Sequence, residues 1–385
     1  MKKTFKVLVF CLIINLLFSV NILAHENKEN IYVLFNNLYV NDKDLISINE
    51  YINIFDKEKY NITLLNVEHK SNKEIYELLQ QENNKNKIDI IQILGIESNV
   101  PSFSFDSHVS VGNVGFVEQN LKTDYFYCNL NNNYNEISRF KVKNKNELNI
   151  DFKPLIKVIR LPISNGDYTF YINKFKDYLT LNKSDFDFQG FYKNINLDFK
   201  NKDKFNFKYL FEKTLKLKNT EFFSNKEFKV EHIDNSTIKN YYISYHGSKN
   251  GVEDFINIDN YNNYLSNNYF NMALISCNII KDIDNKNIIY NMMAKGKNIY
   301  NISFSSSYYL YNDINYNSVA SLKNSKFFYY VFYEYYNNLY NKQMNNTNSY
   351  FEAIKDYTNS TNINELLNQD LNNLIFMGHY GLVEP

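Results

Sequence analysis

The sequence predicts an α/β protein built on a mostly parallel sheet. Short apolar runs, typical of strands that are buried on both faces, alternate along the chain with segments of helical periodicity. No fixed-period repeat and no Gly-, Ser- or Pro-rich linker divides the chain, which favours one compact unit with helices covering a sheet. One split sheet and two separate sheets both remain compatible with this pattern.

The expected elements begin with a βαβ pattern in the first part of the chain. Strands at residues 31–38 and 60–67 precede a helix that opens with the capping box Ser71-Asn72-Lys73-Glu74, and the apolar run at residues 88–94 follows. A second series continues to the end of the chain. It comprises strands at residues 155–161, 228–232, 241–245, 270–276 and 298–304, and helices at residues 167–179, 208–216, 261–265, 287–294, 326–340 and 350–357.

The N-terminus predicts export. Lys2 and Lys3 precede an apolar run at residues 7–23, and Ala24 supplies a small residue for cleavage, which together indicate a signal peptide over residues 1–24. An uncleaved membrane anchor is the alternative, because about 20 apolar residues can span a bilayer. After cleavage we expect no stable membrane span, and a protein that is secreted or held in the cell envelope.

The balance of charge argues against one class of binding partner. The chain carries 42 Lys and Arg against 42 Asp and Glu, so its formal net charge is zero. A nucleic-acid partner is therefore disfavoured, because proteins that bind nucleic acids concentrate basic charge on their surface.

Two cysteines, Cys128 and Cys277, remain after residue 24. A cysteine that is unpaired in an exported protein is either buried and inert or a reactive thiol.

Two expected strands each end on a side chain that could carry chemistry. His246 and Gly247 follow the strand at residues 241–245, and Cys277 follows the strand at residues 270–276. If these strands are parallel neighbours, both side chains emerge at the same edge of the sheet. A nearby imidazole can take the proton of a thiol, and backbone N–H groups of Gly247 and Cys277 can stabilise an oxyanion. A structural histidine and a buried cysteine are the alternative on spacing alone.

These two segments resemble the gingipain-type cysteine peptidases, relatives of caspases and legumain, whose histidine lies in a Gly-His-Gly-Ser pattern and whose cysteine ends the next strand. The likeness extends to Thr123-Asp124-Tyr125-Phe126-Tyr127, Arg160-Leu161-Pro162, Lys295-Gly296-Lys297 and Phe376-Met377-Gly378. The resemblance implies a caspase-like three-layer α/β sandwich with subdomains at residues 25–200 and 201–385. It also implies a cysteine endopeptidase that cleaves protein or peptide substrates, with His246 as acid/base and Cys277 as nucleophile in the second subdomain.

Some positions depart from the pattern of the family. Tyr245 stands where the family usually has the first glycine of Gly-His-Gly, and Ser276 stands where alanine is common. His379 and Tyr380 replace the end of a closing Gly-Asp-Pro. These departures leave open an inactive relative that serves as a surface or binding protein. A transpeptidase, in which an amine receives the acyl group, is a third alternative.

Further site residues are implied only by the resemblance. Some relatives orient the imidazole with a carboxylate, for which Asp167 is the candidate here, although an acid in the first turn of a helix is explained by the helix dipole. Asn173 lies about where arginine-selective relatives place an acid, and Asp254 could contact substrate from another direction. The oligomeric state is not encoded in any pattern that we find.

No cofactor is expected for this chemistry. A structural calcium ion is compatible with Asp282 and Asp284, because hard cations prefer carboxylate oxygens. The histidines at positions 69, 108 and 232 lack the spacing of a zinc site.

Overall fold

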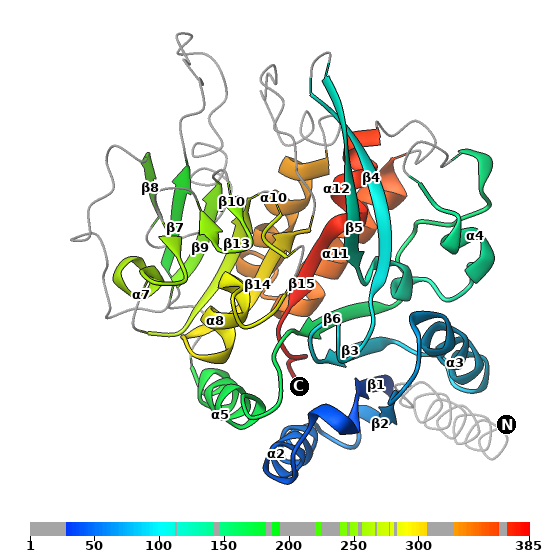
Figure 1. Cartoon of the computed structure of the whole chain (residues 1–385). Coiled ribbons are helices and arrows are strands. Elements are labelled where there is room, and N and C mark those ends of the chain that lie inside the picture. The colour runs from blue at the N-terminus through cyan, green and yellow to red at the C-terminus, as the bar shows by residue number, and fades with distance from the viewer. Residues whose placement is uncertain are drawn as a thin grey trace, which may run out of the picture.

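The computed structural model describes residues 28–111, 114–141, 146–181, 187–192, 220–224, 239–244, 247–252, 256–265, 268–276, 278–280, 283–305, 327–361 and 368–385. Within these residues a ten-stranded sheet runs through the molecule (Figure 1) in the order β2-β1-β3-β6-β15-β14-β13-β9-β7-β8. Its strands are β1 Glu29–Phe35, β2 Tyr60–Asn66, β3 Ile90–Leu94, β6 Lys157–Leu161, β7 Asp187–Tyr192, β8 Thr220–Ser224, β9 Lys239–Ser244, β13 Phe270–Ile275, β14 Asn298–Phe304 and β15 Met377–Tyr380.

The sheet is parallel except at one pair. Strands β14 and β15 pair antiparallel, whereas every other neighbouring pair is parallel. The short strand β15 also joins the two parts of the sheet, because Tyr380 pairs with Arg160 of β6 on its other side. The expected mostly parallel α/β architecture is confirmed, and its strands form one sheet.

Helices cover both faces of this sheet and make three layers (Figure 1). Helices α2, α5 and α8 bury their apolar faces in one core cluster, and helices α3, α10, α11 and α12 bury theirs in a second cluster across the sheet. The helices are α2 Asp42–Ile52, α3 Asn72–Lys85, α4 Tyr134–Ser138, α5 Tyr168–Leu179, α7 Tyr261–Tyr264, α8 Ile288–Ala294, α10 Phe327–Tyr340, α11 Asn346–Ser360 and α12 Asn368–Phe376, with short 3-10 turns at Asn37–Tyr39 and Tyr125–Cys128.

Local signals explain where several helices begin. The predicted capping box of α3 is present: Ser71 Oγ accepts from the backbone N–H of Glu74, and the Glu74 carboxylate accepts from the backbone N–H of Ser71. Asn287 caps α8 in the same sense, because its side chain accepts from the N–H groups of Ile289 and Tyr290. The expected helix at residues 208–216 and strand at residues 228–232 lie outside the described residues.

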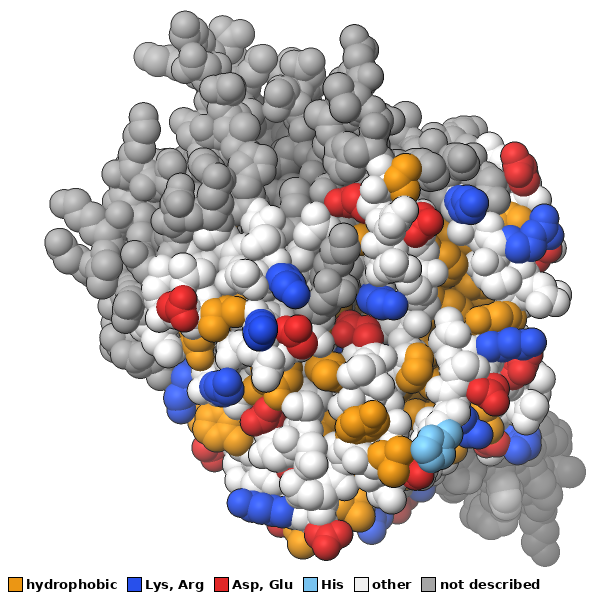
Figure 2. Space-filling view, viewed as in Figure 1, with side chains coloured by type: hydrophobic (Ala, Val, Ile, Leu, Met, Phe, Trp, Pro, Cys, Tyr) orange, Lys and Arg blue, Asp and Glu red, His pale blue; other side chains and the backbone are white. Residues whose placement is uncertain are grey.

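In the described part of the chain, two smaller sheets flank the main one. Strands β4 Phe103–Val111 and β5 Val114–Thr123 form a long antiparallel hairpin, and β10 Gly247–Ser248, β11 Gly251–Val252 and β12 Ile256–Asn257 form a three-stranded sheet. In Figure 1 the hairpin extends toward the same end of the molecule as the arrowheads of β9 and β13. Basic and acidic side chains are intermixed over the face shown in Figure 2.

Candidate active site

The two strands that carry the proposed dyad are neighbours. Strands β9 and β13 pair in parallel along their whole length, and Ser244 lies opposite Ile275 at their carboxyl ends. The expectation that both strands end at one edge of the sheet is therefore met. His246 and Cys277, together with Tyr245, lie outside the described residues, and so does Asp254.

Gly247 lies directly against the end of β13. A Cβ atom built on Gly247 would lie 2.6 Å from Cβ of Ser276 and 3.1 Å from Cδ1 of Ile279. Contacts below 3.0 Å do not occur at real Cβ atoms, so this position has no space for a side chain. The residue that follows His246 therefore touches residues close to Cys277 on either side of it in sequence.

The segment after Cys277 is held by three hydrogen bonds to other parts of the fold. Asn278 Nδ2 donates to Oε1 of Glu118 on β5 at 3.1 Å. Asn287 Nδ2 donates to the carbonyl of Ile279 at 2.5 Å, and the N–H of Ile280 donates to the carbonyl of Phe304 at 3.1 Å. This segment is thus tied to the hairpin, to the start of α8 and to the end of β14.

Asp167 contacts another element instead of capping its own helix. It occupies the N-cap of α5 without a side-chain cap, and its carboxylate accepts a hydrogen bond from the hydroxyl of Tyr290 on α8. That hydroxyl also lies 2.6 Å from Oγ of Ser164. Burial, followed by the bond to Asp167, raises the pKa of Tyr290 to about 12, so this tyrosine stays protonated at neutral pH.

The remaining expected site residues are dispersed. Asn173 is exposed on the surface of α5. Asp284 accepts a hydrogen bond from the backbone N–H of Lys286 at 2.8 Å, which is a turn contact, and Asp282 lies outside the described residues. Within the described part of the chain, no group of three or more His, Cys, Asp and Glu side chains could hold a metal ion.

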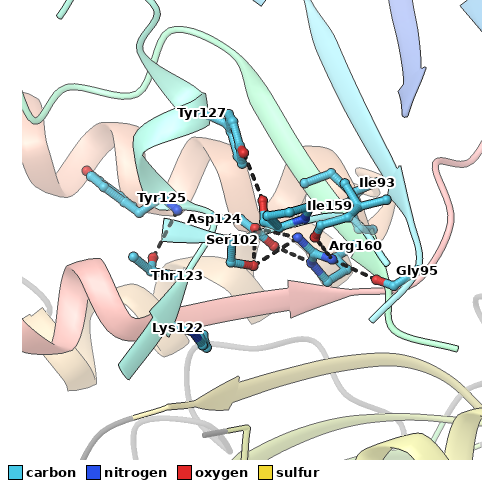
Figure 3. Close-up of polar contacts among 12 residues, drawn as sticks. Ile93, Gly95, Ser102, Lys122, Thr123, Asp124, Tyr125, Tyr127, Ile159 and Arg160 are labelled. Carbon is cyan, nitrogen blue, oxygen red and sulfur yellow. Dashed lines mark hydrogen bonds and ion pairs between the residues drawn. The ribbon is translucent and has the colours of Figure 1, made fainter. Parts of the chain in front are cut away.

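Arg160, near the carboxyl end of β6, forms a network of hydrogen bonds (Figure 3). Its side chain is 1% exposed, and Nε and Nη2 donate to the two carboxylate oxygens of Asp124 at 2.6 and 2.7 Å. Its other N–H groups donate to the carbonyls of Gly95 and Val100 and to Oγ of Ser102. All five donors are satisfied, so the buried charge is compensated and the loop after β3 is fixed to β6.

Glu97 is a polar residue at this edge that sequence reasoning missed. It follows β3 and lines a cavity of about 50 Å³ together with Arg160 and His379. It also lines an outer groove of about 380 Å³ together with Lys122 and Asp284. Burial, partly offset by the Arg160 charge, raises the pKa of Glu97 to about 7. The signal was present, because Glu97 comes soon after a fully buried strand, as His246 and Cys277 do.

Cys128 differs in kind from a reactive thiol. It is free and 6% exposed, and burial raises its pKa well above the ordinary value. A buried thiol of this kind is a poor nucleophile. Since Cys128 is free, a disulfide between Cys128 and Cys277, which would have favoured an inactive binding protein, is absent.

No helix in the part of the chain that the structure describes has both the length and the apolar character to cross a membrane. The predicted signal segment lies outside that part.

The architecture defines the class of fold. A mostly parallel sheet between two helical layers, with β9 and β13 side by side and the antiparallel strand β15 in its middle, is the caspase-like α/β fold that the sequence led us to expect. The crystal structure of the Arg-specific cysteine proteinase gingipain R superposes on it with a TM-score of 0.62 and 11% sequence identity. The superposition covers 93% of this chain and 78% of the gingipain chain.

Sequence comparison adds no relative. No protein-family model matches the chain, and no curated protein matches it. The likeness to gingipain R therefore establishes a shared fold and the fold of a cysteine proteinase, and it does not assign membership of that family.

Proposed function

We propose that this protein is an exported cysteine endopeptidase that hydrolyses peptide bonds through a dyad of Cys277 and His246. The fold of a cysteine proteinase supports the reaction class. The order of the two residues along the chain, each directly after a buried strand, supports the assignment of the dyad.

One contact carries the proposal. Gly247 packs against Ser276 and Ile279 so closely that no Cβ fits between them. Gly247 follows His246, and Ser276 precedes Cys277, so this contact at the ends of β9 and β13 supports the proposal that the imidazole and the thiol lie close together. Reactive groups of α/β proteins gather at this edge of the sheet.

The chemistry follows from these groups. His246 takes the proton of Cys277, and the resulting thiolate attacks the carbonyl carbon of the scissile bond. The backbone N–H groups of Gly247 and Cys277 donate to the oxyanion that forms. The intermediate collapses to a thioester as the amine leaves with the proton from His246. A water molecule, deprotonated by His246, then attacks the thioester carbonyl and releases the carboxylic acid and the thiol.

The accessory residues keep narrower roles in this proposal. Asp167 is the carboxylate that we propose to orient the imidazole through Oδ1, because the hydroxyl of Tyr290 donates to Oδ2. Asp254 is the acidic side chain that we propose for substrate contact. Asn173, which is exposed on α5, provides no charge for the selection of a basic side chain. No cofactor takes part in any step.

Substrate profiling tests the proposal. The chain without residues 1–24 is incubated with a diverse peptide library, with Cys277→Ala and His246→Ala as controls and circular dichroism as the check of folding. We expect cleavage by the wild type and none by either folded variant. Cleavage that persists in Cys277→Ala, or no cleavage of any peptide by the wild type, contradicts the proposal. In the second case, a binding protein that retains the fold becomes the better account.

A further inference from the structure

A carboxylate on the β4–β5 hairpin reaches the residue that follows Cys277. Glu118 lies on β5 and is only 8% exposed, and its Oε1 accepts a hydrogen bond from Asn278 Nδ2 at 3.1 Å. The two residues are far apart in sequence and belong to different sheets. A bond between a carboxylate and an amide is charge-assisted and therefore stronger than a neutral one.

Asn278 needs such a restraint because of its backbone. Its φ is +55°, in the left-handed region that few residues other than glycine adopt. Asparagine tolerates this conformation better than most side chains, but the conformation is still costly unless surrounding contacts hold it. The dihedral at Asn278 sets the direction of the chain immediately after Cys277.

The hairpin is shaped to deliver Glu118. Its register shifts between Phe105 and Ser107, so that β5 contains one extra residue at this point, and Asn120 beside the irregularity has a φ of +57°. A bulge of this kind re-aims the side chains that follow it, and such bulges are common next to active sites. Beyond the shift, Glu118 lies opposite Ser107.

The support under Glu118 is itself fixed to the core. Ser107 Oγ donates to Oδ1 of Asn372, and Thr123 Oγ1 donates to the carbonyl of Ile375, both on α12. Ser305, just after β14, donates through Oγ to the carbonyl of Lys122 at 2.7 Å. The carboxylate is thus carried by a strand that is anchored to α12 and to the end of β14, and a rigid support of this kind can transmit a positional restraint.

We propose that Glu118 is a positioning residue for the Cys277 thiol, and that it acts by holding Asn278 in its left-handed conformation through the 3.1 Å hydrogen bond. This inference rests on the proposed function in one respect only, the role of Cys277 as nucleophile. Glu118 acts on the thiol through Asn278 in this account. Its removal lets the chain after Cys277 relax and turns the thiol away from its reactive geometry.

Thiol alkylation tests the inference without any substrate. The rate constant for reaction of Cys277 with iodoacetamide is measured across pH for the wild type, Glu118→Ala, Asn278→Ala and the double variant, with Cys277→Ala as the blank. Cys128 does not compete because it is buried with a raised pKa. We expect each single variant to react about tenfold more slowly. The double variant should react faster than the product of the two single losses predicts, because both variants remove the same contact between Glu118 and Asn278.

Conservative variants provide the test if the alanine variants do not fold. Glu118→Gln retains an amide oxygen that can accept from Asn278, so its alkylation rate should stay within about threefold of the wild type. Asn278→Asp places two carboxylates in contact, so its Cys277 should react slowly. The double variant Glu118→Gln with Asn278→Asp restores one hydrogen bond, in which the residue at position 118 donates and the residue at position 278 accepts. Its alkylation rate should therefore recover. Glu58→Ala, at an exposed surface position, is the matched control and should behave as the wild type.

The outcomes separate this inference from the proposed function. Folded Glu118→Ala with a wild-type alkylation rate overturns the positioning role, and so does a double variant in which the two losses multiply. If Cys277 couples to Glu118 but no peptide is cleaved by the wild type, the positioning role stands and the peptidase proposal fails. Where a peptide substrate is found, the same variants should lower kcat more than they change KM, because the proposed role of Glu118 is to position the nucleophile.

Discussion

Gly247→Ala tests whether the ends of β9 and β13 pack as closely as the site requires. The new Cβ would lie 2.6 Å from Cβ of Ser276, at least 0.4 Å closer than the 3.0 Å that real Cβ atoms respect. The position of a Cβ is fixed by its own backbone, so no rotation of Ser276 can relieve this contact, whereas Cδ1 of Ile279 at 3.1 Å can move. Ser276 is fully buried, which leaves a shift of the backbone as the response. We expect a loss of about 1–3 kcal/mol in the free energy of unfolding.

A double-mutant cycle measures the contact itself. Ser276→Gly alone should cost about 1 kcal/mol, because glycine gains backbone entropy in the unfolded chain. Combined with Gly247→Ala, it removes the opposing Cβ, so the double variant should be more stable than the sum of the single losses by at least about 1 kcal/mol. The assay is urea unfolding at constant m-value. Ser303→Gly, at a buried serine of β14, is the control: its loss in the free energy of unfolding should add to that of Gly247→Ala without any coupling. Strict additivity of Gly247→Ala and Ser276→Gly would refute the close approach.

Four further predictions concern ionisable side chains outside the proposed dyad. Burial lowers the pKa of His379 from 6.5 to about 3, so the folded state loses stability as pH falls from 6.5 toward 3. His379→Phe should remove up to roughly 5 kcal/mol of this pH dependence in unfolding titrations. Glu97 has a raised pKa of about 7, so the folded state gains as pH falls toward 4.5, and Glu97→Gln should stabilise the protein more at pH 8 than at pH 5. Lys174 donates to the buried carbonyls of Met293, Gly296 and Asn298 at 2.6, 3.1 and 2.8 Å, so Lys174→Met leaves these acceptors without this donor and should cost about 1–3 kcal/mol in urea unfolding. Lys176→Met, at a surface pair, should cost under about 1 kcal/mol. Arg160→Met strands the Asp124 carboxylate and should cost about 3–5 kcal/mol by thermal or urea unfolding. A measured loss below about 1 kcal/mol for Lys174→Met or Arg160→Met, or an unchanged pH dependence for His379→Phe or Glu97→Gln, would contradict the corresponding account.

The periodicity of the sequence predicts most strands of the main sheet, but it does not predict the β4–β5 hairpin or the short strand β15. Apolar runs placed β13 and β14 within a residue of their observed ends, and the capping box placed the start of α3. The β4–β5 hairpin is not among the predicted elements, because a pattern of parallel strands joined by helices does not include it, although Gly112-Asn113 between two runs of alternating residues is a hairpin signal. Strand β15 has four residues, and its partners are distant in sequence, so no local pattern marks it.

Some residues of the candidate site could be predicted from the sequence, and others could not. The rule that reactive groups follow buried strands led to His246 and Cys277, and the pairing of β9 with β13 meets the geometric condition that this rule requires. The same rule applied to β3 would have found Glu97. Glu118 could not be found in this way, because its role depends on a register shift in a hairpin and on a contact with a residue far along the chain. Asp167 was chosen by resemblance, and its bond to Tyr290 depends on how α5 and α8 pack.

Covalent labelling of the thiol tests the central claim most directly. The folded protein is treated with a peptidyl acyloxymethyl ketone at neutral pH, and the modified residue is identified by intact mass and peptide mapping, with Cys277→Ala and His246→Ala alongside. The account predicts one adduct per chain on Cys277, strongly reduced labelling of the His246 variant and none of the Cys277 variant. An unlabelled wild-type protein, or an adduct of equal yield in the absence of His246, would contradict a Cys277–His246 dyad.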